Sequence, residues 1–302
     1  MNLRRLVALG ALVLALAVPP AAVGEDAPFV GWSALLPGLT LPYDPTSPDD
    51  CIAGRSQCVD KTIREMTRRF DPLASSCDHN AIFSLTYLRV TEEYRRTIEK
   101  PFFDDTQFVN YEDTMFAHYY FAAFDAWAAG RIGEVPPAWR VAFDAAAKHA
   151  VSASGDLLLG INAHVQRDLP LVLYSIGLIA PDGTSRKPDH DRVNIILNRV
   201  ADDVIAEIAR RFDPTIDDAN VPTSLDDAAL LQTLVAWREK AWRNAEALAA
   251  APTPEARDIV VAQIENDAAT EARAIEASTA YPPLSQGSGP RDAYCAVHHD
   301  DP

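Results

Sequence analysis

Basic residues are scarce in this chain, which has 27 lysines and arginines against 43 aspartates and glutamates, for a formal net charge of -16. This deficit disfavours a nucleic-acid backbone or an anionic membrane face as the main partner, because both are themselves negative. The ordinary explanation for so much acid is solubility, and a surface suited to cations is the alternative.

The chain also lacks the short motifs of several large enzyme classes. It has no phosphate-binding loop, no dinucleotide-binding glycine pattern, no nucleophile elbow and no HExxH. Their absence counts against common nucleotide-dependent enzymes, serine esterases and zinc peptidases. No stretch alternates apolar and polar residues as a half-buried β-strand does, so the pattern favours a helical protein.

Long hydrophobic runs are equally scarce. The run at residues 6–18 follows two arginines, precedes small residues, and is too short to cross a bilayer. This layout is typical of a secretory signal peptide, which we predict at residues 1–24, with an uncleaved anchor as the alternative. We therefore expect a secreted or extracytoplasmic protein with no membrane span after cleavage. Residues 25–50, rich in proline, glycine and serine, are predicted to form an irregular linker.

Cysteine is rare too, with four residues in 302. An even number in an exported chain suggests two disulfides, and four cysteines allow three pairings. We favour Cys51 with Cys58, which closes a short loop, and Cys77 with Cys295, which ties the C-terminal tail to the helical body. No two cysteines have the close spacing of a zinc finger.

What the chain has in abundance is apolar residues at helical spacing, broken by proline and glycine. The predicted fold is all-α, a single multi-helix bundle at residues 51–285 with an irregular N-terminal lead-in and a flexible tail at residues 286–302. Asp71-Pro72 and Asp213-Pro214 are interpreted as helix stops, and Ser154 as a helix cap. The predicted helices cover residues 59–70, 79–100, 110–130, 138–150, 157–176, 189–212, 225–251 and 254–278.

The helix at residues 157–176 carries the polar residues that most need an explanation. His164 and Asp168 are four positions apart and share one helix face. Such a pair inside an apolar helix needs partners, because burying it unpaired is costly. Three interpretations are open. They are a hydrogen-bonded core pair in which Asp168 fixes the tautomer of His164, a metal site, and acid–base catalysis without a metal.

Two other helices offer polar residues to the same place. Asp113 heads an aromatic stripe, so it either satisfies the helix dipole or looks into a pocket. Asp191 and Asn194 share a face that is either the solvent side or a cleft. His79 and His149 are interpreted as structural or exposed, and the tail histidines as loose metal binders at most. The predicted ligands of one zinc-like divalent ion are His164, Asp168, Asp191 and Asp113, with Asn162, Asn194, His118 and Tyr120 as pocket walls.

Four blocks of sequence occur in a fixed order, FAHYYFAAFDAW, VPPAWRVAFDAA, LLLGINAHVQRDLPLVL and DHDRVNIIL. Together they resemble a bacterial family of unknown function, DUF5995, over roughly Asp104 to Asn198. The resemblance implies no activity. It implies a shared motif. Asp113 matches this motif more loosely, and His118 stands where the family leads us to expect a different residue. The positions of that motif are Asn162, His164, Asp168, Pro170, Asp191, Val193 and Asn194.

A second similarity concerns the pair His164 and Asp168 alone. Secreted helical phosphoesterases, such as the zinc-dependent phospholipase C and single-strand nuclease group, use His-x-x-x-Asp pairs as zinc ligands, although this chain has too few histidines for a three-metal site. The leading hypothesis is therefore metal-assisted hydrolysis of a phosphoester-type small molecule, with His164 and Asp168 as catalytic residues. The alternative is a non-catalytic binding or structural protein, whose buried polar network fixes helix packing.

Overall fold

The structure is a computed structural model that describes residues 43–216, 227–283 and 285–301. The predicted signal peptide and most of the predicted linker lie outside these residues. Within them the fold is all-helical, as the sequence predicts, with two isolated bridges and no strand. The elements are α2 (Ser56–Ser75), α3 (Ala81–Thr97), α4 (Thr106–Ala128), η1 (Ile132–Glu134), α5 (Pro137–Ala147), α6 (Ala153–Asn162), η2 (Ala163–Asp168), α7 (Leu169–Ile176), α8 (Lys187–Arg211), α9 (Asp227–Ala250), α10 (Pro254–Thr279) and α11 (Gly289–His298).

The elements α6, η2 and α7 follow one another without a break and form the central rod, which we define as residues 153–176. Its start differs from prediction, because Ser152 and not Ser154 is the N-cap and accepts a hydrogen bond from the backbone N–H of Gly155. Its middle, η2, has the wider π-helical turn. Pro170 gives a physical reason, since proline donates no N–H and crowds the carbonyl four residues before it.

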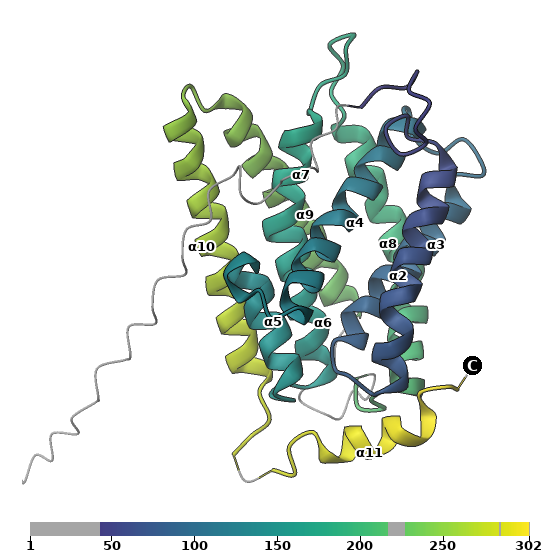
Figure 1. Cartoon of the computed structure of the whole chain (residues 1–302), viewed down its shortest axis with the longest axis vertical. Helices are drawn as coiled ribbons and strands as arrows, with labels where there is room; N and C mark the ends of the chain where they lie inside the picture. Colours follow the sequence, from purple (N-terminus) through teal and green to yellow (C-terminus); the bar gives the residue numbers. More distant parts are fainter. Residues whose placement is uncertain (1–42, 217–226, 284, 302) are drawn as a thin grey trace, which may run out of the picture.

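The central rod lies inside a bundle whose long helices run along a common direction, while α11 crosses one end (Figure 1). Helix α10 packs against α5 and α6, and α9 packs against α7. The rod approaches α3 closely at Gly160, where an added Cβ would come within 2.3 Å of the Phe83 ring. None of the described helices is long and apolar enough to cross a membrane.

The two disulfides pair as favoured from the sequence, Cys51 with Cys58 and Cys77 with Cys295. The second bond attaches α11 to the segment before α3. The prediction of a flexible tail at residues 286–302 was therefore wrong over α11. A short helix with little apolar surface gives a weak local signal, and its order depends on the disulfide and on the buried side chain of Arg291.

One predicted helix stop was also wrong. Helix α2 passes through Pro72 and ends at Ser75. Phe70 and Leu73 on either side of Pro72 are buried. Packing of this last turn outweighs the single backbone hydrogen bond that proline removes near a helix end, where carbonyl groups already lack partners.

Candidate functional site

A cavity of about 120 Å³ lies in the bundle between α3, α4, the central rod, α8 and α9. Its wall is mostly aliphatic and aromatic, with a few ionisable groups from α3, α4, the central rod and α9. The lining residues are Phe83, Thr86, Tyr87, Val90, Tyr94, Val109, Glu112, Asp113, Phe116, Ile161, His164, Val165, Leu169, Val193, Ile196, Leu197, Leu234 and Arg238.

His164 and Asp168 are in contact, as their spacing predicts. The Nδ1 of His164 lies 3.2 Å from Oδ2 of Asp168, and both side chains are buried. The same Oδ2 accepts a 2.8 Å hydrogen bond from the indole N–H of Trp139, and Oδ1 accepts one of 2.6 Å from Arg167. Both oxygens of Asp168 are therefore engaged by strong donors, which leaves little room for a metal ion on this carboxylate.

The network continues from Asp168 to α10. Arg167 donates a second, 2.8 Å bond to Glu265, so the buried guanidinium lies between two carboxylates. Asn162 also ties the rod to α10, because its amide donates to the carbonyl of Ala268 and accepts from Gln166. Asn162 is therefore a structural tie between helices and does not line the cavity.

The imidazole of His164 is stacked on the Phe116 ring, with centroids 3.5 Å apart. Burial lowers the pKa of His164, against the opposing effect of Asp168, so the ring is neutral at neutral pH. Its Nε2 is buried and has no hydrogen-bond partner among the described residues. With Asp168 accepting from Nδ1–H, Nε2 carries the lone pair and can act as a base.

Two adjacent acids on α4 reach the same cavity. Burial, aided by the charge of Glu112, raises the pKa of Asp113 to about 8. Burial also raises the pKa of Glu112 to about 7, although the positive charge of Arg238 opposes it. Within the described chain, neither Oδ2 of Asp113 nor the hydroxyl of Tyr87 has a hydrogen-bond partner. At neutral pH Asp113 is therefore a protonated carboxylic acid beside the cavity.

Arg238 brings a positive charge to the cavity wall. Its Nε donates to Asn194 at 2.9 Å and its Nη2 donates to the carbonyl of His190 at 2.6 Å. Burial lowers the pKa of Arg238 to about 10, which leaves it charged at neutral pH. The predicted pocket residue Asn194 thus does not line the cavity itself, but it holds Arg238, which does. The roles of Glu112, Arg238 and Tyr87 were not predicted from the sequence. The available signal for Glu112 was the presence of two adjacent acids in an aromatic helix.

The structure does not bring the four predicted metal ligands together. His164 and Asp113 line the cavity, and Asp168 lies beside His164. Asp191 is exposed on α8 and pairs with Lys187 at 2.8 Å, away from the cavity wall. His118 is exposed. Tyr120 is buried, and it packs on the ring systems around His164 without lining the cavity.

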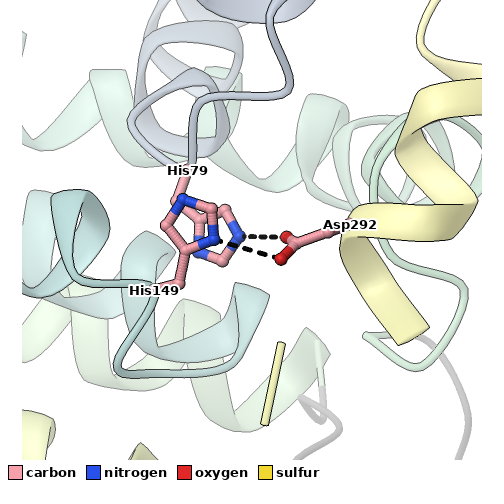
Figure 2. Close-up of side chains that lie close together, drawn as sticks. All are labelled: His79, His149 and Asp292. Atoms are coloured by element: carbon pink, nitrogen blue, oxygen red, sulfur yellow. Dashed lines mark hydrogen bonds and ion pairs between the residues drawn. The ribbon is translucent and has the colours of Figure 1, made fainter. Parts of the chain in front are cut away.

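His79 and His149, interpreted from the sequence as structural or exposed, come together with an aspartate. His79, His149 and Asp292 place nitrogen and oxygen atoms within 4.8 Å of one another (Figure 2). Of the groups of three or more His, Cys, Asp or Glu that the described residues offer, this is the one close enough to hold an ion. The signal for it was present in the sequence. Pairing Cys77 with Cys295 brings the segment of His79, two residues on, near the segment of Asp292, three residues before.

The model of a family of unknown function, DUF5995, matches residues 59–278. The chain belongs to the DUF5995 family. The match extends well beyond the region of roughly Asp104 to Asn198 expected from the motifs. No curated protein and no solved structure matches the chain.

The extent of the DUF5995 match separates the two polar centres of the molecule. Every residue that lines the cavity falls within residues 59–278, as do His79 and His149. Asp292 and Cys295 fall beyond the matched residues, on α11. The cavity is therefore built wholly from the DUF5995 region, whereas the histidine pair gains its carboxylate from α11.

Proposed function

We propose that this protein binds a small, uncharged and largely apolar molecule in the cavity and hydrolyses it by acid–base chemistry. The observation that supports this is a group of three buried polar atoms without partners in the described chain: Nε2 of His164, the hydroxyl of Tyr87 and Oδ2 of Asp113. They come from three helices, and their residues line one apolar cavity. Buried polar groups are normally hydrogen-bonded, so a ligand's polar atoms are natural partners for these three.

The size of the cavity limits the ligand. An apolar cavity of about 150 Å³ accepts a benzene molecule. A cavity of about 120 Å³ therefore suits a single small ring or a short branched chain with one or two polar atoms. The surrounding aliphatic and aromatic groups favour the apolar body, and the partnerless groups of His164, Tyr87 and Asp113 supply specificity.

Hydrolysis needs a base for water and an acid for the leaving group, and the cavity offers both. Nε2 of His164 takes a proton from water, and the resulting hydroxide bonds to the electrophilic carbon of an ester. The carbon–oxygen bond to the leaving group breaks as Asp113 gives its proton to that oxygen. A later proton transfer from the imidazolium to the Asp113 carboxylate restores both groups. Asp168 holds the imidazole and stabilises its positive charge.

This proposal replaces the metal-assisted hypothesis at His164. A metal on Asp168 would have to displace Arg167 or Trp139 from the carboxylate, and Asp191 is engaged with Lys187 elsewhere. The mostly aliphatic and aromatic wall also disfavours a phosphoester, because a charged substrate would lose its hydration in a medium of low dielectric constant. The two disulfides favour an extracytoplasmic location, where such bonds persist.

Binding is tested with phenol, which has a ring for the cavity and a hydroxyl for its polar wall. Isothermal titration calorimetry on the disulfide-bonded protein should show one site. Val193→Phe should fill the cavity and weaken binding at least tenfold. Val200→Phe is the matched control, two turns further along α8 and outside the lining of this cavity. Equal affinities of the two variants and the parent would remove the cavity as the binding site.

Catalysis is tested with phenyl acetate, by following the release of phenol. His164→Gln should lower kcat at least 100-fold, the usual contribution of a general base, while phenol affinity changes only a few-fold. Asp113→Asn should lower kcat as well. If both variants hydrolyse phenyl acetate like the parent, the acid–base assignment is wrong. If phenol binds but no variant and no parent turns over ester, the protein is a binding protein whose polar network serves packing.

A further inference from the structure

A second polar centre lies at the end of the bundle that α11 crosses. The two imidazoles of His79 and His149 are stacked with centroids 4.0 Å apart, and both face the carboxylate of Asp292 (Figure 2). Nε2 of His79 lies 2.8 Å from Oδ1 of Asp292, and Nδ1 of His149 lies 3.1 Å from Oδ2. The hydroxyl of Ser288 donates to the same Oδ2 at 2.7 Å.

A buried carboxyl lies behind this cluster. Oδ2 of Asp156 is 3.5 Å from Nδ1 of His79 and accepts a 2.6 Å bond from Arg291. The other oxygen of Asp156 is buried and has no hydrogen-bond partner in the part of the chain that the structure describes. Arg291 also lies 3.1 Å from Nδ1 of His79. The charges that face His79 are therefore two carboxyl groups, one guanidinium and the second imidazole.

We propose that His79, His149 and Asp292 bind one divalent transition-metal ion of the zinc class. Three protein ligands with two imidazoles and one carboxylate form a common zinc donor set with an open fourth position. In a tetrahedral centre with ligand bonds of about 2 Å, donor atoms lie about 3.3 Å apart, close to the two nitrogen–oxygen separations of 2.8 and 3.1 Å. Imidazole nitrogen favours zinc, cobalt or nickel over calcium and magnesium, which prefer oxygen ligands.

The surroundings of His79 suit this role. A metal at Nε2 requires a lone pair there, which moves the ring proton to Nδ1. Arg291 lies 3.1 Å from this atom and can only donate, so its guanidinium must turn away from Nδ1 when the metal binds. Oδ2 of Asp156 is then placed to accept from Nδ1–H, the carboxylate–histidine–metal arrangement found at many zinc sites. Metal binding displaces the direct contacts between the Asp292 oxygens and the imidazoles. The side chain of His149 is 43% exposed, so one position of the ion remains open to water or to the Ser288 hydroxyl.

The site would connect three segments that are distant in sequence. His79 precedes α3, His149 follows α5, and Asp292 lies in the first turn of α11. The Cys77–Cys295 disulfide joins two of the same segments. The ion would therefore act as a second link that holds α11 against the body, next to the disulfide. This inference is independent of the cavity and its chemistry.

The test is titration of zinc chloride into the disulfide-bonded protein after treatment with a chelator. Calorimetry should give one ion per chain, and magnesium or calcium at the same concentration should give no binding. His149→Ala and Asp292→Asn should each weaken zinc binding at least tenfold. These two positions are partly exposed, so their variants should fold, which circular dichroism checks. His118→Ala, at an exposed histidine outside the cluster, should leave the affinity unchanged.

The tail histidines are the main competing explanation, since His298 and His299 lie on the same terminal segment. Replacing both with glutamine should leave the single strong site. A site that survives in His149→Ala and disappears in the tail variant would overturn the proposal. Cobalt gives a second readout, because Co²⁺ bound to two imidazoles and a carboxylate absorbs visible light. The parent should show this absorption, and Asp292→Asn should lose it. Absence of any zinc or cobalt binding by the parent would also overturn it.

Discussion

The two polar centres contain the same residue types but differ in what surrounds the carboxylate. In the cavity centre, Asp168 is fully buried and is held by Arg167, Trp139 and His164. In the α11 centre, Asp292 is 35% exposed, and its oxygens contact two imidazoles and a serine hydroxyl. One carboxylate is fixed by strong donors and can only orient its histidine. The other is held by groups that a metal ion can replace.

This comparison teaches that a histidine and an aspartate do not define a site by themselves. Neighbouring charges decide whether the carboxylate is available, and burial decides whether the imidazole titrates. Burial lowers the pKa of His164, and it lowers the pKa of His79 to about 3, helped by Arg291. Both rings are therefore neutral at neutral pH. His164 has a nitrogen without a partner among the described residues beside an apolar cavity, whereas both nitrogens of His79 have polar partners, Asp292 and Arg291.

The largest expected effect comes from removing the Cys77–Cys295 disulfide, which should affect the α11 centre more than the cavity centre. That bond closes a separation of 218 residues, against 7 for Cys51–Cys58. A disulfide limits the conformational entropy of the unfolded chain, and more so for a longer loop. Replacing the long-range pair with serine should therefore lower the free energy of unfolding by about 5 kcal/mol, and replacing the short-range pair by about 2 kcal/mol. Denaturant unfolding measures both. At 10 °C, with the fold of the variant checked by circular dichroism, zinc affinity should fall while phenol affinity persists. Equal losses of the two affinities would show that the centres are not separable.

A second change tests how differently the two carboxylates are held. Asp168→Ala leaves a buried guanidinium with one partner fewer, and also leaves an indole N–H and an imidazole unpaired. It should destabilise by about 3–5 kcal/mol. Asp292→Ala removes a partly exposed group and should destabilise by about 1 kcal/mol or less. Urea unfolding at pH 7 compares them. Similar costs for the two would contradict the contrast between a fixed and a replaceable carboxylate.

A third change acts on the wall between the centres. Phe83 lines both the cavity and the smaller pocket beside His79, and Gly160 packs against its ring. Gly160→Ala should force this ring away and destabilise by about 1–3 kcal/mol, as overpacking does. Gly133→Ala is the control, because an added Cβ there meets nothing within 4 Å. Thermal unfolding measures both variants. Equal melting temperatures would mean that α3 and the central rod can move apart without loss of stability.

A fourth change concerns the charge of the cavity acid. The pKa of Asp113 is raised from 3.8 to about 8, so its protonation favours the fold at low pH, and that contribution is lost progressively as the pH rises from about 4 to 8. Asp113→Asn should match the parent near pH 4, become steadily more stable than the parent between pH 4 and 8, and keep a constant advantage above pH 8. Denaturant midpoints across pH check this. A constant difference between pH 4 and 9 would contradict the raised pKa.

The pH dependence of ester hydrolysis should report the protonation of Asp113 and of His164. Activity needs neutral His164 and protonated Asp113, so kcat should be level near neutrality. It should fall above pH 8 as Asp113 ionises, and at acid pH below the ordinary imidazole value of 6.5 as His164 gains a proton. Rates with phenyl acetate from pH 4 to 10 test this. If kcat of Asp113→Asn still falls above pH 8, the ionisation of another group must cause that fall.

Local patterns predicted the helices well where each helix carries its own signals. The buried rod, the long α8 and its end before Asp213-Pro214 follow from apolar spacing and stop residues. The contact between His164 and Asp168 follows from helix geometry alone. Helix α11 did not follow, because a short helix with few apolar residues is ordered by its attachment and not by its own sequence.

The candidate site was only partly predictable, for a definite reason. A helix pattern tells which residues share a face but not which side chain from another helix meets that face. Arg167 and Trp139 take up the oxygens of Asp168, so the predicted metal set is not assembled. Conversely, His79 and Asp292 are 213 residues apart, and without the disulfide nothing local relates them.

The sequence by itself determined an all-helical chain, the preferred cysteine pairs and a histidine with its aspartate one turn apart. These are short-range properties, set by backbone periodicity and by the few pairings that four cysteines allow. Only the tertiary structure decided that His164 borders an apolar cavity beside a protonated acid, and that His79 meets His149 and Asp292. Protonation, desolvation and ligand availability depend on what lies within a few ångströms in space, and packing between distant helices sets those distances.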